Sequence, residues 1–363
     1  MPLAEGLSLL KLWVGLLLAG GITLAVTPWV RQQAFRWGAV DRPEARKVHR
    51  KVMPRLGGLA VYAGFVTAVL VTMPLTPALR GLLLGMTLIL LLGIWDDTRG
   101  LSPRVKLAGQ VVAALVLLPL GVQVHFITNP FNGHIVDLGW LSIPVTIFWV
   151  VAVTNAVNLI DGLDGLAGGV SCIAAVTMAV VGWTQWQVFG AAGQREIIML
   201  ALMLAAALLG FLRYNFHPAR IFLGDCGSML LGYTLAVMAI MGLTKSVTAV
   251  SVLVPLVILG IPLLDTFFAI LRRCHRHRPI FQPDKEHLHH QLLAMGLSHR
   301  QAVLVIYGVS ALLGASAVIL NLVATDQALA LLVVMAILII AGANKVGVTG
   351  RIPDRDRQTS SRF

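Results

Sequence analysis

Eleven long apolar segments constrain the fold of this chain more than any other feature. A helix needs about 20 apolar residues to cross the hydrocarbon core of a bilayer. The 363-residue chain is 57% hydrophobic and 12% charged, with a mean hydropathy of +0.84, whereas soluble domains are about 25% charged. These values predict an all-α, polytopic integral membrane protein. The predicted spans lie near residues 8–30, 56–73, 79–95, 105–124, 141–157, 166–188, 196–213, 226–243, 247–271, 301–323 and 327–343.

Positive residues are concentrated in alternate loops of this pattern. Together, segments 31–55, 96–106, 213–225, 272–300 and 344–363 hold 24 of the 28 Lys and Arg residues. Because cytoplasmic loops are enriched in Lys and Arg, we expect the N-terminus to face outward and the C-terminus to face the cytoplasm. The net charge of +12 therefore reports mainly topology, and we expect membrane lipids rather than nucleic acid as partners.

Five clusters of polar residues interrupt the apolar pattern, all on the predicted cytoplasmic side. Three of them contain five of the chain's 16 acidic residues. Carboxylates beside a bilayer are costly to bury, so they are usually functional. Carboxylates with amides indicate a hard ion such as Mg²⁺, and neighbouring basic residues and histidines indicate phosphate. The clusters are 47–55, 96–97, 155–164, 215–225 and 287–290.

Spacing within the acidic clusters leaves several interpretations open. Asp96 and Asp97 close a predicted span, where the helix dipole opposes them, and adjacent helical positions diverge by about 100°. One carboxylate can therefore bind or orient a ligand while the other acts as a base. Asp161 and Asp164 share one helix side, in a glycine-rich segment that could also be a helix-packing seam. Asp225 is either a helix N-cap or a metal ligand.

Three further features carry expectations of their own. The histidines of 287–290 do not follow a usual zinc spacing, so we expect them to donate to phosphate oxygens. Asp265 lies inside the ninth span and needs a partner, for which Arg272 and Arg273 are candidates. Segment 125–140 contains an Asn-Gly flanked by β-prone residues, which indicates a short hairpin without a chemical role.

The order of the motifs resembles the polyprenyl-phosphate N-acetylhexosamine-1-phosphate transferases. The resemblance covers residues 46–290. It rests on Pro-Arg-Leu-Gly-Gly at 54–58, Asp-Asp at 96–97, Asn-Ala-Val-Asn-Leu-Ile-Asp-Gly-Leu-Asp-Gly at 155–165, Phe-Leu-Gly-Asp at 222–225 and His-Leu-His-His at 287–290. It implies that a UDP-N-acetylhexosamine and undecaprenyl phosphate react to give the lipid-diphosphate sugar and UMP.

Two of these motifs separate the bacterial branches of the family. One branch transfers phospho-N-acetylmuramoyl-pentapeptide and usually has Pro-Thr-Met-Gly-Gly and three consecutive histidines. This chain differs at both places. It resembles the branch that transfers N-acetylglucosamine-1-phosphate to start cell-envelope glycans such as teichoic acid or lipopolysaccharide O-antigen. The implied location is the bacterial inner membrane, with the active site on its cytoplasmic face.

The resemblance also implies roles for individual residues. Asp225 is the implied main ligand of Mg²⁺ (or of Mn²⁺ as a substitute), with Asp161 or Asn158 nearby. The implied catalytic group is Asp96 as a base toward the lipid phosphate, Asp97 as a supporting carboxylate, Asp161 and Lys106. The implied substrate-binding residues are Arg55, His287, His289 and His290 for phosphates, Asp164 and Asn215 for the nucleotide, Phe222 for uracil, and Asn155 and Asn158. A homodimer is implied as well.

We therefore predict that residues 1–343 form a single transmembrane catalytic domain and that 344–363 form a basic, disordered cytoplasmic tail. Direct attack by the lipid phosphate is favoured over an aspartyl-phosphate intermediate. Alternatives are the same chemistry with another UDP-sugar, including UDP-N-acetylmuramoyl-pentapeptide, or an ion-coupled transporter. A transporter would place its acids near the bilayer midplane. An intramembrane aspartyl protease leaves Asn158, Asp161 and the histidine cluster unexplained. A CDP-alcohol phosphotransferase needs an Asp-Gly-x-x-Ala-Arg pattern, which residues 161–166 do not follow.

Overall fold

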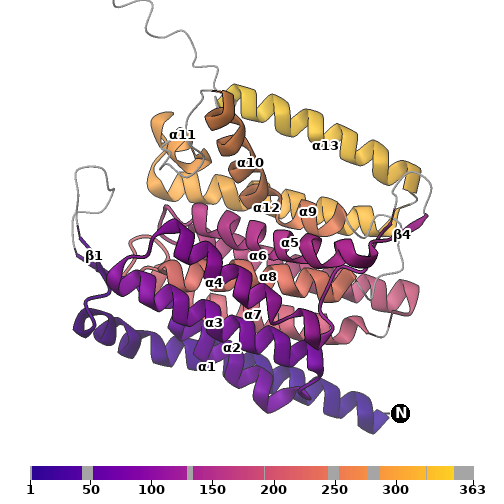
Figure 1. Cartoon of the computed structure of the whole chain (residues 1–363), viewed down its shortest axis with the longest axis horizontal. Helices are drawn as coiled ribbons and strands as arrows, with labels where there is room; N and C mark the ends of the chain where they lie inside the picture. The colour runs from indigo at the N-terminus through magenta and orange to yellow at the C-terminus, as the bar shows by residue number, and fades with distance from the viewer. Residues whose placement is uncertain are drawn as a thin grey trace, which may run out of the picture.

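The computed structural model describes residues 2–42, 52–128, 134–191, 193–243, 253–275, 287–323 and 325–346. Long helices lie side by side along the longest axis of the molecule, with β1 and α11 at one end and β4 at the other (Figure 1). Parts of four predicted features lie outside the described residues, namely 47–51 of the basic cluster, 129–133 of segment 125–140, 247–252 of the ninth span and most of the tail.

The predicted apolar segments correspond closely to helices. Eight helices of the described chain are long and apolar enough to cross a membrane, and Gly57–Thr72 and Ala330–Ile339 are shorter apolar helices. The polytopic, mostly helical architecture is confirmed, whereas the total of eleven spans and the orientation of the termini stay predictions. The helices are α1 (Pro2–Arg36), α2 (Gly57–Thr72), α3 (Pro77–Arg99), α4 (Pro103–Leu115), α5 (Ser142–Leu159), α6 (Leu166–Phe189), α7 (Gln194–Asn215), α8 (Asp225–Leu243), α9 (Leu253–Ile258), α10 (Gly260–His275), α11 (Leu288–Ala294), α12 (His299–Leu322) and α13 (Thr325–Val346).

Short polar signals fix where several helices begin. The Thr76 hydroxyl accepts a hydrogen bond from the Leu79 amide, and the Ser102 hydroxyl accepts one from Val105. A proline follows each of these N-caps, at a position where no backbone N–H is needed. Ser298 and Gln301 form a reciprocal capping box at the start of α12. Local sequence alone therefore sets these three starts.

Two predicted spans are interrupted, at 105–124 and at 247–271. Helix α4 ends at Leu115 and is followed by the 3-10 helix η1 (Leu118–Leu120), while α9 ends at Ile258 before α10 begins. A proline lies four residues after each of these ends, Pro119 and Pro262. Proline has no N–H for the carbonyl four residues earlier. Residues Pro103–Leu120 still form a candidate membrane span despite the break, and the ninth predicted span stays a prediction.

Two short antiparallel strand pairs lie at opposite ends of the bundle. Strand β1 (Val40–Asp41) pairs with β2 (Met53–Pro54). Strand β3 (Phe126–Thr128) pairs with β4 (Ile135–Asp137), with Ile127 opposite Val136. The second pair confirms the hairpin predicted for segment 125–140. A second 3-10 helix, η2 (Gly139–Leu141), leads from it into α5.

Helix α8 is the most buried of the eight long apolar helices, and it packs against α2, α3, α5 and α6. Its first turn approaches α3 very closely, because a methyl group added at Gly93 would overlap the Cα atom of Cys226. Only glycine allows the two backbones to come this near. The start of α8 is thus held directly against α3, the helix that carries Asp96 and Asp97.

We expect Gly93→Ala to destabilise the protein. The added methyl group would overlap backbone rather than a movable side chain, and overpacking of this kind costs about 1–3 kcal/mol. The measurement is the thermal unfolding midpoint of the purified protein in detergent. The matched control is Gly21→Ala in α1, where nothing lies within 4 Å of the added group. Equal midpoints for the two variants would show that the contact between α3 and α8 is not tight.

Candidate active site

Two motifs about 165 residues apart in the sequence form a backbone ladder at one end of the bundle. The amide of Phe222 donates to the carbonyl of Pro54 at 2.8 Å. The amides of Gly57 and Gly58 donate back to the carbonyls of residues 222 and 223, each at 3.0 Å. The Pro-Arg-Leu-Gly-Gly and Phe-Leu-Gly-Asp motifs therefore lie side by side, and α8 begins where the ladder ends.

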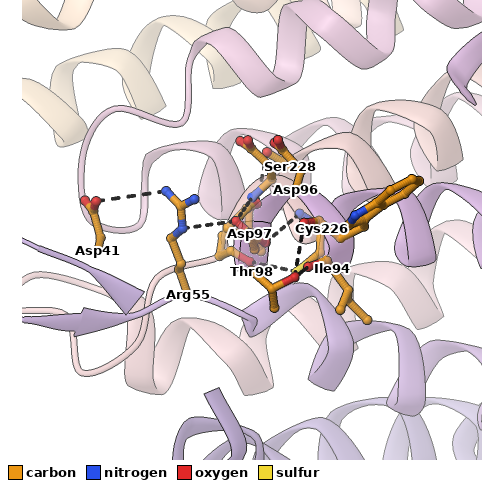
Figure 2. A network of polar contacts seen from close by, with 12 residues as sticks. Asp41, Arg55, Ile94, Asp96, Asp97, Thr98, Cys226 and Ser228 are labelled. Carbon is orange, nitrogen blue, oxygen red and sulfur yellow. Dashed lines mark hydrogen bonds and ion pairs between the residues drawn. The ribbon is translucent and has the colours of Figure 1, made fainter. Parts of the chain in front are cut away.

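Asp97 holds the first turn of α8. Its two carboxylate oxygens accept hydrogen bonds from the backbone amides of Asp225 and Cys226, each at 3.0 Å. Arg55 Nε lies 3.2 Å from the same carboxylate, and the other side of its guanidinium faces Asp41 at 3.9 Å (Figure 2). Gly224 has a φ of +76°, a conformation that favours glycine, and lies directly against Asp97. The Asp97 side chain is fully buried. Because it binds the backbone amide of Asp225, it fixes the position of that residue.

Asp96 and Asp225 converge on one ammonium group. Lys106 Nζ lies 2.8 Å from Asp225 Oδ2 and forms an ion pair with Asp96 Oδ2. The other oxygen of Asp96 accepts from the Leu101 amide at 2.7 Å. Asn158 Nδ2 donates to Asp225 Oδ1 at 2.9 Å. The structure thus brings together the predicted residues 96, 106, 158 and 225 from four different helices.

Asp161 and Asp164 add two more carboxylates in the connection between α5 and α6. Burial raises the pKa of Asp161 well above its ordinary value, and the charges of Asp225, Asp97 and Asp164 raise it further. Negative charge is therefore in excess around Asp161. A divalent cation would relieve this repulsion, and carboxylate and amide oxygens are the ligands that Mg²⁺ prefers. Asp225, Asp161 and Asn158 carry carboxylate and amide oxygens of this kind.

Two of the predicted substrate-binding amides are used within the protein. Asn155 and Gln110 form a reciprocal amide pair, with Asn155 Nδ2 donating at 2.6 Å and Gln110 Nε2 donating back at 3.3 Å. Asn155 also donates to the Val151 carbonyl. Asn215 donates to the Ile221 carbonyl at 3.0 Å and closes the loop before α8. Both amides shape the site. Phe222 is half-buried beside Arg55 on the backbone ladder.

The histidine cluster is anchored on α10. His287 Nδ1 pairs with Asp265 Oδ2 at 2.8 Å, and the Leu288 amide donates to the other oxygen of that carboxylate. His287 was not among the partners expected for Asp265, which were arginines. The His289 ring packs directly on Gly162, next to Asp161. Its ring lies 4.2 Å from that of His290. The predicted cluster thus reaches the acidic loop.

Three residues near the site were missed by the sequence analysis. Gln110 is a polar residue inside a predicted span, and this alone could have singled it out. His217 lies in a loop that was recognised for its other residues, and it pairs with Asp164 Oδ2 at 2.8 Å. His299 accepts a hydrogen bond from the Asp164 amide at 2.9 Å. It follows the His287–His290 cluster and carries no local signal.

Comparison with known proteins gives the family of the chain. The profile of glycosyl transferase family 4 matches residues 79–243. A probable undecaprenyl-phosphate N-acetylglucosaminyl 1-phosphate transferase of Bacillus subtilis is 44% identical over 82% of this chain and 82% of its own. A decaprenyl-phosphate N-acetylglucosaminephosphotransferase of Mycolicibacterium smegmatis is 37% identical over 89% and 86%. An undecaprenyl-phosphate alpha-N-acetylglucosaminyl 1-phosphate transferase of Yersinia pestis is 28% identical over 80% and 79%.

The chain therefore belongs to glycosyl transferase family 4, as its motifs indicated. Its similarity to the Bacillus subtilis and Yersinia pestis proteins agrees with the predicted branch. The matched range contains both ends of the acidic site, from the Asp96–Asp97 pair to Asp225. The individual roles of the site residues stay predictions.

Stability should depend on pH through His289. Burial lowers the pKa of His289 to about 3, against about 6.5 when unfolded. The unfolded chain therefore takes up a proton below pH 6.5 that the folded protein does not, and stability falls as the pH falls. Between pH 7.5 and 5.5 we expect a loss of about 1 kcal/mol from this residue.

Thermal midpoints of the wild type and His289→Gln at both pH values measure this loss. Between the two pH values, the variant should lose less stability than the wild type, and the difference should be the loss of about 1 kcal/mol assigned to His289. Asp161 acts in the opposite sense, because its raised pKa makes the folded protein take up a proton first, and the comparison between the two proteins removes its effect. Identical pH dependence in both would show that His289 is not buried in a neutral form.

Proposed function

We propose that the protein transfers N-acetylglucosamine-1-phosphate from UDP-N-acetylglucosamine to undecaprenyl phosphate and releases UMP. The reaction would take place at the cytoplasmic face of the bacterial inner membrane, as the first membrane step of a cell-envelope glycan. The observation that carries the proposal is the convergence of Asp96, Asp225 and Lys106 beside Asp161 at one end of the bundle. The names of the relatives support the donor and the lipid acceptor.

The geometry supports direct attack by the lipid phosphate. An oxygen of that phosphate would attack the sugar-bearing phosphorus of the donor, and the bond from this phosphorus to the bridging oxygen would break, so that UMP leaves with the bridging oxygen. By analogy with other phosphate monoesters, the lipid phosphate has a second pKa of about 6, so it is largely dianionic at neutral pH. Asp96 is bound by Lys106 and the Leu101 amide, and Asp97 by two amides and Arg55. These contacts favour a positioning role for both carboxylates over a covalent one.

The charged residues supply positioning and neutralisation, which are the main requirements of phosphoryl transfer. The Lys106 side chain is about one-quarter exposed. If Asp225 bound a metal ion instead of Lys106, the ammonium group would be available to a phosphate oxygen. Asp225, Asp161 and Asn158 would hold Mg²⁺, with Mn²⁺ as a substitute. When bound, the ion would neutralise the pyrophosphate and stabilise the leaving UMP.

The polyprenyl chain needs an apolar path beside the site. A cavity of about 400 Å³ lies between α9, α10, α12 and α13, with Leu256, Phe267, Leu313 and Met335 among its lining residues. Helix α10 also carries Asp265, the partner of His287. This arrangement would bring the lipid tail to a helix that is connected to the polar site.

The direct test is UMP release by the purified protein in detergent. The assay contains UDP-N-acetylglucosamine, undecaprenyl phosphate and Mg²⁺, with parallel reactions that lack lipid or contain EDTA. UMP that requires both lipid and metal would support the transferase and its donor. Release with another UDP-sugar, including UDP-N-acetylmuramoyl-pentapeptide, would keep the chemistry and change the substrate. Folded protein that releases no UMP from any UDP-sugar would refute the proposal.

Asp225→Asn should reduce kcat for UMP release by more than about 100-fold, the scale seen when one key electrostatic group is removed. The side chain is partly exposed and its backbone amide remains bonded to Asp97, so the fold should persist. The checks are initial rates at saturating substrates and a thermal midpoint within about 3 °C of the wild type.

Asp97→Asn is the contrasting variant. The new amide can accept only one of the two backbone hydrogen bonds, which leaves a buried N–H of α8 without a partner and costs about 1–3 kcal/mol. Both activity and midpoint should fall. If Asp225→Asn lost stability as Asp97→Asn does, its effect on kcat would not identify a catalytic or metal-binding role.

A further inference from the structure

Asp164 is held in one orientation by the loop between α7 and α8. Its Oδ2 atom accepts two hydrogen bonds, one from His217 Nδ1 at 2.8 Å and one from the Ala219 amide at 3.0 Å. Of the described residues, none donates to Oδ1, and the side chain is 15% exposed. The carboxylate is thus fixed through one oxygen while the second remains available to a ligand.

A second histidine completes this arrangement from the start of α12. His299 Nε2 accepts the hydrogen bond of the Asp164 amide at 2.9 Å, so this nitrogen carries no proton. The two imidazole rings stack, with centroids 4.2 Å apart and planes 21° apart. The Arg300 guanidinium donates to the carbonyl of His217. Backbone, side chain and neighbouring loop of Asp164 are therefore all held by groups outside its own segment.

The three side chains Asp164, His217 and His299 are close enough to suggest a metal site, since their ligand atoms lie within 4.8 Å of one another. Ring stacking argues against it. An imidazole nitrogen binds a metal through a lone pair in the plane of its ring, and two nearly parallel rings stacked 4.2 Å apart cannot both point these lone pairs at one ion. The His299 lone pair is moreover occupied by the Asp164 amide.

We propose that His217 and His299 are positioning residues that orient Asp164 toward a hydrogen-bond donor on the UDP part of the sugar donor. The inference rests on the proposed function and on the predicted role of Asp164 in binding the nucleotide. Asp164 is near enough to Asp161 to raise its pKa, so the oriented carboxylate adjoins the acidic centre. His217 acts on Asp164 Oδ2 and His299 on its backbone, and neither touches the reacting atoms.

The test uses the full-length protein in detergent, with two readouts. The affinity for UDP-N-acetylglucosamine is measured by calorimetry, and KM and kcat are measured by UMP release. His217→Ala removes the donor to Oδ2, so KM for the UDP-sugar should rise about tenfold, the effect of losing one hydrogen bond to a charged group. We expect kcat to change by less than about twofold, because a group that binds donor and transition state alike changes only KM.

Two amide variants keep the test valid if His217→Ala folds poorly. In His217→Asn the amide nitrogen takes the place of Nδ1 and can donate to Asp164, so KM should return to within about threefold of the wild type. In His217→Gln the nitrogen reaches the position of Nε2, so KM should stay raised. The control His125→Ala replaces an exposed histidine at the opposite end of the bundle and should leave both constants unchanged.

The same logic applies to His299. His299→Gln places an acceptor where Nε2 lies and should retain affinity, whereas His299→Phe offers none and should weaken it. Unchanged affinity in His217→Ala, or equal KM for the Asn and Gln variants, would overturn the inference while the wild-type activity still stands. A wild type that neither binds nor uses UDP-N-acetylglucosamine would instead refute the proposed function, and this inference with it.

Discussion

The site depends on one buried carboxylate at the start of a helix. The first amides of any helix lack partners within it, and α8 begins inside the protein, where water cannot supply them. Asp97 satisfies two of these amides from α3, and Arg55 balances its charge. The same interaction fixes the backbone position from which the Asp225 side chain extends. Three segments distant in the sequence are thus joined at Asp225, the predicted metal ligand.

Crowded negative charge distinguishes this end of the bundle from an ordinary helix-packing region. Five aspartates gather there, and the pKa of Asp161 is raised first by burial and then by the charges of Asp225, Asp97 and Asp164. Lys106 neutralises part of this charge by binding Asp96 and Asp225 together. Such an arrangement costs stability in the free protein, and binding of a cation and a pyrophosphate would offset that cost. The acidic centre, the histidines on Asp164 and the cluster on α10 then form one continuous polar region.

Much of the fold could be predicted because its determinants are local. Hydropathy located the apolar helices, and the Asn-Gly segment indicated the hairpin. The helix starts at Thr76 and Ser102 are also set by local capping residues. The interruptions after Leu115 and Ile258 also follow from a local rule, the missing N–H of a proline four residues later. Partners across the bundle could not be predicted. Gln110 and Asn155 are 45 residues apart, and Asp164 and His299 are 135 apart.

The sequence by itself determined that the chain is a polytopic, mostly helical membrane protein, and its polar motifs predicted a site that handles phosphate, because segment hydropathy and residue chemistry do not depend on folding. Only the tertiary structure decided which partner each side chain of those motifs binds. Asp97 and Asp96 are adjacent and chemically identical, yet one is bonded to the α8 amides and the other to Lys106. Asn155 and Asn158 share a motif, yet one closes a helix contact and the other binds Asp225. Which groups surround each side chain is set by packing between distant segments.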